Sequence, residues 1–320
     1  MRAYIVKRLL LAVPTLLGVS IFIFILMRII PGDVALVILG EDADVNPERL
    51  AQVRERLGLT APLHEQYLRW LWNSVRLDFG DSFLSERSVA WLISIRLPLT
   101  ATLAFYALSI TLIIAIPLGA IAAVRRDTWA DYLARSLALV GLAIPNFWLG
   151  IMIMLFLVLY FSWLPPLEYI GFFDDPWGNF SQLIWPAMAV GTGYVALVSR
   201  ITRSAILEVL GEDYVRTARA KGLSRNVIIG RHILRNAMLP IVTVLGMEFA
   251  FLLSGVVITE AVFGLPGIGT LLIQGIHGRD YPVVEATILL VAIMVVLINL
   301  FVDILYAWLD PRISYASEPR

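Results

Sequence analysis

The chain has 320 residues, of which 59% are hydrophobic and 16% are charged, and its 25 basic residues balance 25 acidic ones. A net charge of zero provides no bulk attraction to nucleic acid. The sequence contains no cysteine, which excludes disulfide bonds and thiolate metal sites. The apolar residues come in long uninterrupted runs, so the composition indicates an integral membrane protein rather than a soluble one.

Six apolar runs are long enough to cross a bilayer as helices, because about 20 apolar residues span the hydrocarbon core. The runs are too long and too uniformly apolar for barrel strands, so the predicted fold class is an all-α polytopic membrane protein. The first run follows basic residues, as a signal peptide does, but it is too long for one and is expected to be a retained anchor. The predicted spans are residues 9–30, 97–124, 136–162, 181–200, 238–263 and 283–308.

Basic side chains are distributed unequally between the loops. Residues 125–135 and 201–237 are rich in arginine, whereas residues 163–180 contain no basic side chain and residues 264–282 contain one. Because Lys and Arg concentrate on the cytoplasmic side of membrane proteins, we expect the arginine-rich loops and both termini to be cytoplasmic. The long segment 31–96 is then extracellular.

The extracellular segment is expected to be folded. Asn46 and Pro47 predict the start of a helix that Gly58 ends, and APLHEQYLRWLWNSVRL predicts a second helix. The segment is either a small cap on the span ends or a docking surface for an outside partner. The predicted division is residues 1–30 as the N-terminus and first span, 31–96 as the extracellular segment, 97–308 as the transmembrane core with the cytoplasmic loop 201–237, and 309–320 as a cytoplasmic tail.

The stretch EDYVRTARAKGLSRNVIIGRHILRNAMLP, residues 212–240, places a basic segment between two apolar spans. The fourth span is expected to continue as a helix to a break at Gly211. Glu212 and Asp213 then suit the positive end of a short helix, and Gly222 suits its termination. Ser224 is a candidate cap for the next helix. Such a helix either transmits the motion of a cytoplasmic partner to two spans or lies on anionic lipid.

This segment resembles the characteristic cytoplasmic loop of binding-protein-dependent ABC importer permeases, with the pattern E-A-A-x3-G-x9-I-x-L-P. Ala218 and Gly222 match its second alanine and its glycine, and the Leu-Pro at 239–240 matches its end. Arg216 and Thr217 depart from its glutamate and first alanine, and the spacing from the glycine to the final proline is five residues longer.

Both departures are typical of the dipeptide, oligopeptide and nickel branch of these permeases, where YVRTARAKGL is followed by RHxLRNAxLP. This chain has YVRTARAKGL at 214–223 and RHILRNAMLP at 231–240. The resemblance covers nearly the whole chain, including KRLLLAVPTLLGVSIFIFILMRIIPGD near the start and EAVFGLPGIGTLLIQGIHGRDYPVVEA near the end.

The resemblance implies a type I importer fold in the cytoplasmic (inner) membrane of a prokaryote. It implies a second homologous permease, two cytoplasmic ATPase subunits that bind ATP and Mg, and an extracellular solute-binding protein. This chain is expected to be non-catalytic and to bind no cofactor or metal itself. The short helix would be the coupling helix, with an ATPase interface formed by Asp213, Tyr214, Arg216, Thr217, Ala218, Arg219, Lys221 and Gly222.

Polar residues inside spans are functional candidates, because they are costly in hydrocarbon. The candidates for the translocation pathway are Glu248, Ser254, Asn299 and Asp303. Glu248 lines the pathway or is hydrogen-bonded to another helix or to the second permease, and Asp303 lines the pathway or pairs with an arginine of a neighbouring helix. Glu260 and Glu285, near the outer span ends, are expected to meet water or a docked partner.

The sequence disfavours two other functions for this membrane protein. An intramembrane hydrolase needs paired catalytic groups at one depth, and no span carries two aspartates or a histidine. A stand-alone channel or secondary transporter would need no partner ATPase, and no G-x4-G-K-[ST] loop is present in this chain. Peptides are the expected cargo, with nickel, glutathione or oligosaccharides as alternatives.

Overall fold

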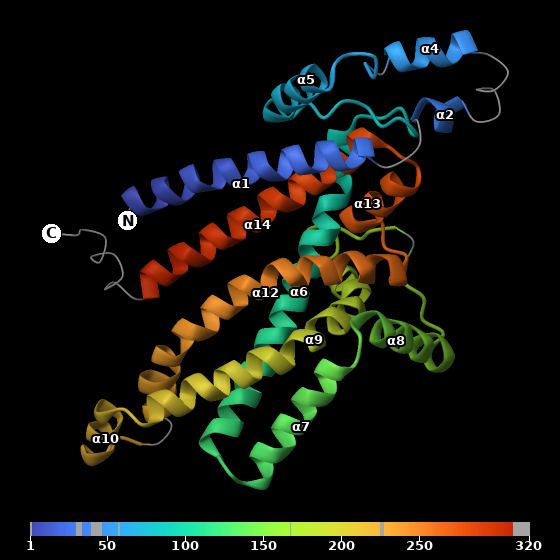
Figure 1. Cartoon of the computed structure of the whole chain (residues 1–320). Helices are drawn as coiled ribbons and strands as arrows, with labels where there is room; N and C mark the ends of the chain where they lie inside the picture. Colours follow the sequence, from blue (N-terminus) through green and yellow to red (C-terminus); the bar gives the residue numbers. More distant parts are fainter. Residues whose placement is uncertain are drawn as a thin grey trace. The chain divides into compact units, whose positions relative to one another are not determined.

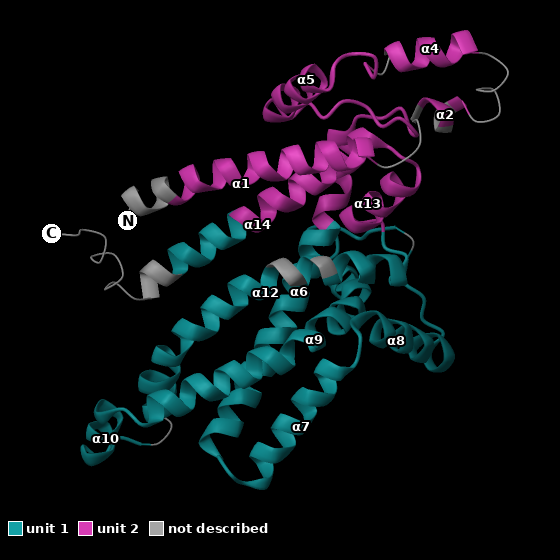
Figure 2. Ribbon diagram, viewed as in Figure 1, with its two compact units in different colours: residues 1–5, 99–265, 297–320 teal, residues 6–98, 266–296 magenta. Residues whose placement is uncertain are grey.

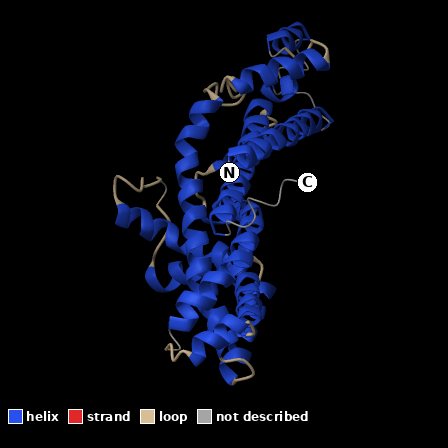
Figure 3. Cartoon of the chain, turned by 90° about the vertical axis from the view of Figure 1, so that its left-hand side faces the viewer, coloured by secondary structure: helices blue, strands red, loops and turns tan. Residues whose placement is uncertain are grey.

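The computed structural model describes residues 2–29, 34–39, 47–56, 58–166, 168–224 and 227–309. These residues form helices joined by short loops, and no strand occurs among them (Figure 3). The chain divides into two compact units (Figure 2). Unit 1 comprises residues 1–5, 99–265 and 297–320, and unit 2 comprises residues 6–98 and 266–296.

Unit 1 contains most of the predicted membrane core. Helix α9 packs against α7, α8 and α12, so its apolar sides are largely covered by other helices. The turn between α6 and α7 and the short helix α10 both lie at the lower end of unit 1 in Figure 1. The helices are α6 Val89–Val124, which begins in unit 2, α7 Trp129–Ala143, α8 Asn146–Phe161, α9 Pro176–Leu210, α10 Asp213–Ala220, the π-helix η1 Ile228–Ile233 and α12 Leu234–Phe263.

Unit 2 contains most of the first span and the predicted extracellular segment. Two buried apolar clusters hold it together, one around Val89, Leu271 and Val283 and the other around Ile23 and Tyr281. Helix α4 begins at Pro47 as predicted, while its proposed cap Asn46 lies outside the described residues. The helices are α1 Arg2–Ile29, α2 Val34–Leu39, α4 Pro47–Arg56, α5 Leu63–Val75, α13 Ile268–His277 and α14 Tyr281–Leu309, whose last part belongs to unit 1.

Five of the six predicted spans coincide with single long apolar helices. The predicted span 136–162 is divided between two helices, because α7 and α8 meet at an angle of 95°. The break lies at Ile144 and Pro145, where Ile144 has an extended backbone and Pro145 precedes the first residue of α8. Proline disfavours helical geometry at the residue before it, which accounts for the position of the break.

The fifth span ends in a turn that is followed by an additional helix. Helix α12 ends at Gly264, which has a left-handed backbone with φ of 64°, and α13 begins at Ile268. The helix that follows Gly264 was not predicted from the sequence.

Candidate functional site

Helix α10 is short and amphipathic, and one side of it is anchored to the chain. Val215 is 0% exposed and Ala218 is 6% exposed, and residues three apart lie on the same face of a helix. Both belong to the apolar cluster of Ile206, Ile228 and Ile233. The end of α9 and the start of the next membrane helix therefore enclose the inner face of α10.

The ends of α10 follow the local chemistry of the sequence. Helix α9 ends at Leu210, and Glu212 has an extended backbone immediately before the first residue of α10. At the other end Gly222 has φ of 76°, and its amide donates to the Arg219 carbonyl at 3.0 Å. A glycine in this conformation is a common way to end a helix. The predicted start and end of the helix are confirmed, although Glu212 makes no side-chain cap.

The other side of α10 is exposed and basic. The Asn236 amide donates to the Tyr214 hydroxyl at 2.7 Å, which ties the exposed side to α12. The Arg216 guanidinium lies 3.3 Å from the Asp213 carboxylate, but both side chains are exposed, so this pair contributes little to stability. Seven of the eight predicted interface residues are exposed, namely Asp213, Tyr214, Arg216, Thr217, Arg219, Lys221 and Gly222. The eighth, Ala218, lies on the buried side.

The connection from α10 to α12 differs from the prediction. A π-helix precedes α12 where an ordinary helix was expected. The Ile228 amide donates to the Ser224 carbonyl at 3.0 Å. Residues 225 and 226 lie outside the described part.

A buried ion pair near α10 was not predicted from the sequence. Asp131, at the start of α7, is 0% exposed. The Arg203 guanidinium of α9 donates to both of its carboxylate oxygens, at 2.9 and 2.8 Å. The Arg135 Nε lies 3.2 Å from the same carboxylate, and the Asp127 amide donates to it at 3.1 Å. This ion pair holds α7 against α9. Its arginine, Arg203, lies ten residues before the start of α10.

The outer glutamates do not meet water as expected. Glu260 is buried and accepts a hydrogen bond from the Thr100 hydroxyl at 2.6 Å within unit 1. In unit 2, Glu285 is buried and its Oε1 lies 2.5 Å from the Arg28 guanidinium. The expectation was wrong because the sequence gives the depth of a residue along its own helix, but not which other helices pack over it.

Unit 2 also contains a polar cavity of about 570 Å³. Arg28, Arg69 and Glu86 are among the residues that line it. Beside it, Asp280 accepts hydrogen bonds from the Ser82 hydroxyl at 2.5 Å and the Phe83 amide at 3.1 Å. These bonds hold the loop after α5 to the start of α14.

We expect Glu285→Gln to destabilise the protein by about 2 kcal/mol, because a buried hydrogen bond between two charged groups contributes roughly 1.5–3 kcal/mol. The control is Glu86→Gln, which makes the same chemical change at an exposed residue of the same cavity and should stay within about 0.5 kcal/mol of wild type. Thermal unfolding in nanodiscs measures both. Equal effects from the two variants would contradict a stabilising role for the Arg28–Glu285 pair.

The predicted pathway residues do not line the polar cavity of unit 2. Glu248 is half-buried on α12, and Asn299 and Asp303 lie one turn apart on α14. Ser254 lies on α12, but its side chain is outside the described part. Among the described residues no group of three or more His, Asp or Glu side chains is placed to hold a metal ion.

Two family profiles match the sequence and together cover most of it. The profile of the binding-protein-dependent transport system inner membrane component matches residues 115–315, and the profile of the N-terminal part of such membrane components matches residues 1–104. The chain belongs to this family of inner membrane components. It is therefore a multi-pass membrane protein and the permease subunit of an ABC importer.

Curated relatives match over almost their full length. A putative peptide transport system permease protein of Brucella suis biovar 1 is 42% identical over 315 residues, which cover 98% of this chain and 100% of the relative. The dipeptide transport system permease protein DppB of Escherichia coli K12 is 40% identical over 338 residues, covering 98% and 99%. The glutathione transport system permease protein GsiC of Salmonella paratyphi A is 40% identical over 312 residues, again covering 98% and 99%.

A solved structure shares the fold. The inward-facing MetNI methionine ABC transporter matches with a TM-score of 0.56 and 19% identity, covering 69% of this chain and 97% of that chain. At this identity the likeness concerns the fold alone, which is that of a type I importer permease.

Proposed function

We propose that this permease forms half of the translocation pathway for di- or oligopeptides that a solute-binding protein delivers. The relatives named for peptide, dipeptide and glutathione transport support a peptide cargo, since glutathione is itself a short peptide. The other half of the pathway would be a second homologous permease. Glu248, Ser254, Asn299 and Asp303 remain the proposed pathway residues.

The observation that carries the proposal is the geometry of α10. Its inner side is anchored through Val215 and Ala218 to the ends of two long membrane helices, while its outer side is exposed and basic. A protein that binds the outer side can therefore move both helices together. We assign this surface to one of two cytoplasmic ATPase subunits, which bind ATP and Mg, and expect its basic side chains to face carboxylates there.

The proposed orientation follows from the two basic loops. The α6–α7 turn and α10 lie at the same end of unit 1 (Figure 1), and both carry arginines. The positive-inside rule places this end in the cytoplasm. The segment 31–96, with the polar cavity of unit 2, then faces the solute-binding protein and is the proposed docking region for it.

The test is co-purification of the native complex, followed by ATPase assays in nanodiscs with and without the solute-binding protein. Recovery of two ATPases and a second permease, with hydrolysis stimulated by the binding protein, is the expected result. A chain that purifies alone and still transports solute would contradict the proposal.

Gly222 allows the coupling role to be tested without removing a contact. Its φ is 76° and nothing lies within 4 Å of an added Cβ, so the effect of a side chain there is conformational. We expect Gly222→Val to lower stimulated hydrolysis about tenfold, because a β-branched residue is strongly disfavoured in this region. Gly222→Asn is the control, since asparagine tolerates the conformation, and it should keep most of the activity. Equal activity of the two variants would argue against a requirement for this helix end.

A further inference from the structure

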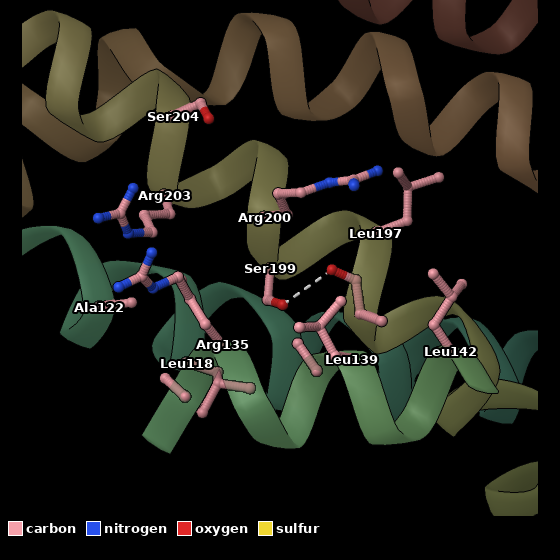
Figure 4. Close-up of a pocket in the computed structure, with 14 residues that line it drawn as sticks. Leu118, Ala122, Arg135, Leu139, Leu142, Leu197, Ser199, Arg200, Arg203 and Ser204 are labelled. Atoms are coloured by element: carbon pink, nitrogen blue, oxygen red, sulfur yellow. Dashed lines mark hydrogen bonds between the residues drawn. The ribbon is translucent and has the colours of Figure 1, made fainter. Parts of the chain in front are cut away.

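A groove of about 310 Å³ opens between α6, α7 and α9, entirely within unit 1 (Figure 4). Small residues at its base let α6 and α9 approach each other closely. A Cβ on Gly119 would lie 2.5 Å from the Ser199 carbonyl oxygen, so α6 and α9 approach too closely for any side chain at that position. Ala122, Ala138 and Ala196 continue this lining of small residues.

The groove is lined by both cationic and apolar side chains. Figure 4 shows Arg135 and Arg203 close together at one end, while the Arg200 side chain extends away from them toward Leu197, where two further leucines lie. Arg200 and Ser204 also line the groove. The leucines are Leu139, Leu142 and Leu197.

The groove carries an excess of positive charge. Asp131 is the carboxylate that contacts its arginines, and it pairs with both Arg203 and Arg135. Two of the three guanidinium groups, those of Arg135 and Arg203, share this one carboxylate. The third, that of Arg200, has no ion pair within the described part of the chain, so the three arginines exceed Asp131 by two positive charges.

The charged and apolar parts of the groove lie at different depths. On α7, Arg135 directly precedes the uncharged run that starts at Ser136, and on α9 Arg200 directly follows the run that ends at Ser199. The ends of such runs mark the boundary between hydrocarbon and head groups. Leu142 is seven residues beyond Arg135 on the same helix face, about 10 Å deeper in the bilayer.

We infer that this groove binds one anionic phospholipid from the leaflet on the α10 side. The phosphate would lie beside the Arg200 guanidinium, and an acyl chain would lie along the leucines. A ligand with one anionic end and a hydrocarbon tail matches both the charge and the depth of the groove. Basic pockets between membrane helices are known to bind such head groups. The inference does not depend on the cargo or on the coupling role of α10.

The test is native mass spectrometry of the purified complex after exchange into detergent with equal amounts of phosphatidylglycerol and phosphatidylcholine. Wild type is expected to retain one phosphatidylglycerol in preference to phosphatidylcholine. Arg200→Gln should lower this retention about fivefold, since a single cationic side chain near an anionic surface contributes an effect of that size. Ala138→Phe, which fills the groove, should remove the bound lipid without changing any charge.

The matched control is Arg125→Gln, which removes the same charge at the same end of unit 1 but does not line the groove. It should retain phosphatidylglycerol as wild type does. Excess inorganic phosphate should not displace the lipid, because the acyl chain is part of the site. Equal retention of the two lipids, equal losses in Arg125→Gln and Arg200→Gln, or displacement by phosphate would overturn the inference. Labelling of the second permease rather than lipid by a photocrosslinker at position 139 would also overturn the inference.

Discussion

Val215→Asp is expected to abolish ATP hydrolysis stimulated by the solute-binding protein. Val215 is fully buried in the cluster that attaches α10 to α9 and η1. An unpaired carboxylate at this position costs several kcal/mol, and the protein avoids that cost by releasing α10 from the cluster. A released helix can still bind an ATPase, but it no longer transmits motion to the membrane helices. Stimulation, rather than basal hydrolysis, is therefore the quantity to measure.

The matched control for this variant is Val227→Asp. It makes the same substitution in the same loop, at a residue that is 40% exposed. Its carboxylate stays in water, so we expect stimulation close to that of wild type. If Val215→Asp retained stimulation while Val227→Asp lost it, the buried side of α10 would not be the coupling element.

Asp131→Asn is expected to destabilise the protein by about 3–5 kcal/mol, because removing one partner of a buried ion pair leaves the other charge uncompensated. Arg203 is the residue left without its carboxylate, and its side chain is only 18% exposed. The loss should be concentrated where α7 meets α9. Thermal unfolding in nanodiscs, with hydrogen exchange along α7, measures both the size and the position of the effect.

Two further variants distinguish the effect of losing the ion pair from the effect of losing any negative charge. Asp127→Asn removes a charge from the same turn, where the side chain is 70% exposed, and should change stability by less than about 0.5 kcal/mol. Asp131→Leu combined with Arg203→Met removes both charges and should recover most of the stability that Asp131→Asn loses. A double variant as unstable as the single one would mean that the shape of the pair, rather than its charge, stabilises the contact.

The chemistry of a few neighbouring residues was enough to predict helix α10. Gly211 marks the break after α9, Asp213 begins the short helix, and Gly222 adopts the left-handed conformation that ends it. Each of these features depends on residues within one or two turns of the chain. The broken third span has a local cause as well, at Pro145, but the angle of 95° between its two halves could not be predicted from composition.

The partners of the buried charges could not be predicted in this way. Asp131 and Arg203 are 72 positions apart in the sequence, and Arg28 and Glu285 are 257 apart. Either arginine could equally have faced lipid head groups or water, since the sequence places each only at the end of an apolar run. The pairing depends on which helices pack side by side.

By itself the sequence determined the membrane class, five of the spans, the family and the position of the short basic helix. These follow from the length of apolar runs, from helix ends and from local motifs, all of which are properties of neighbouring residues. Only the tertiary structure decided that Val215 and Ala218 face inward, that Glu260 and Glu285 are buried and bonded, and that three arginines line one groove. These features depend on contacts between helices that are distant in sequence. Burial and charge compensation depend on what packs around a side chain, which no local pattern specifies.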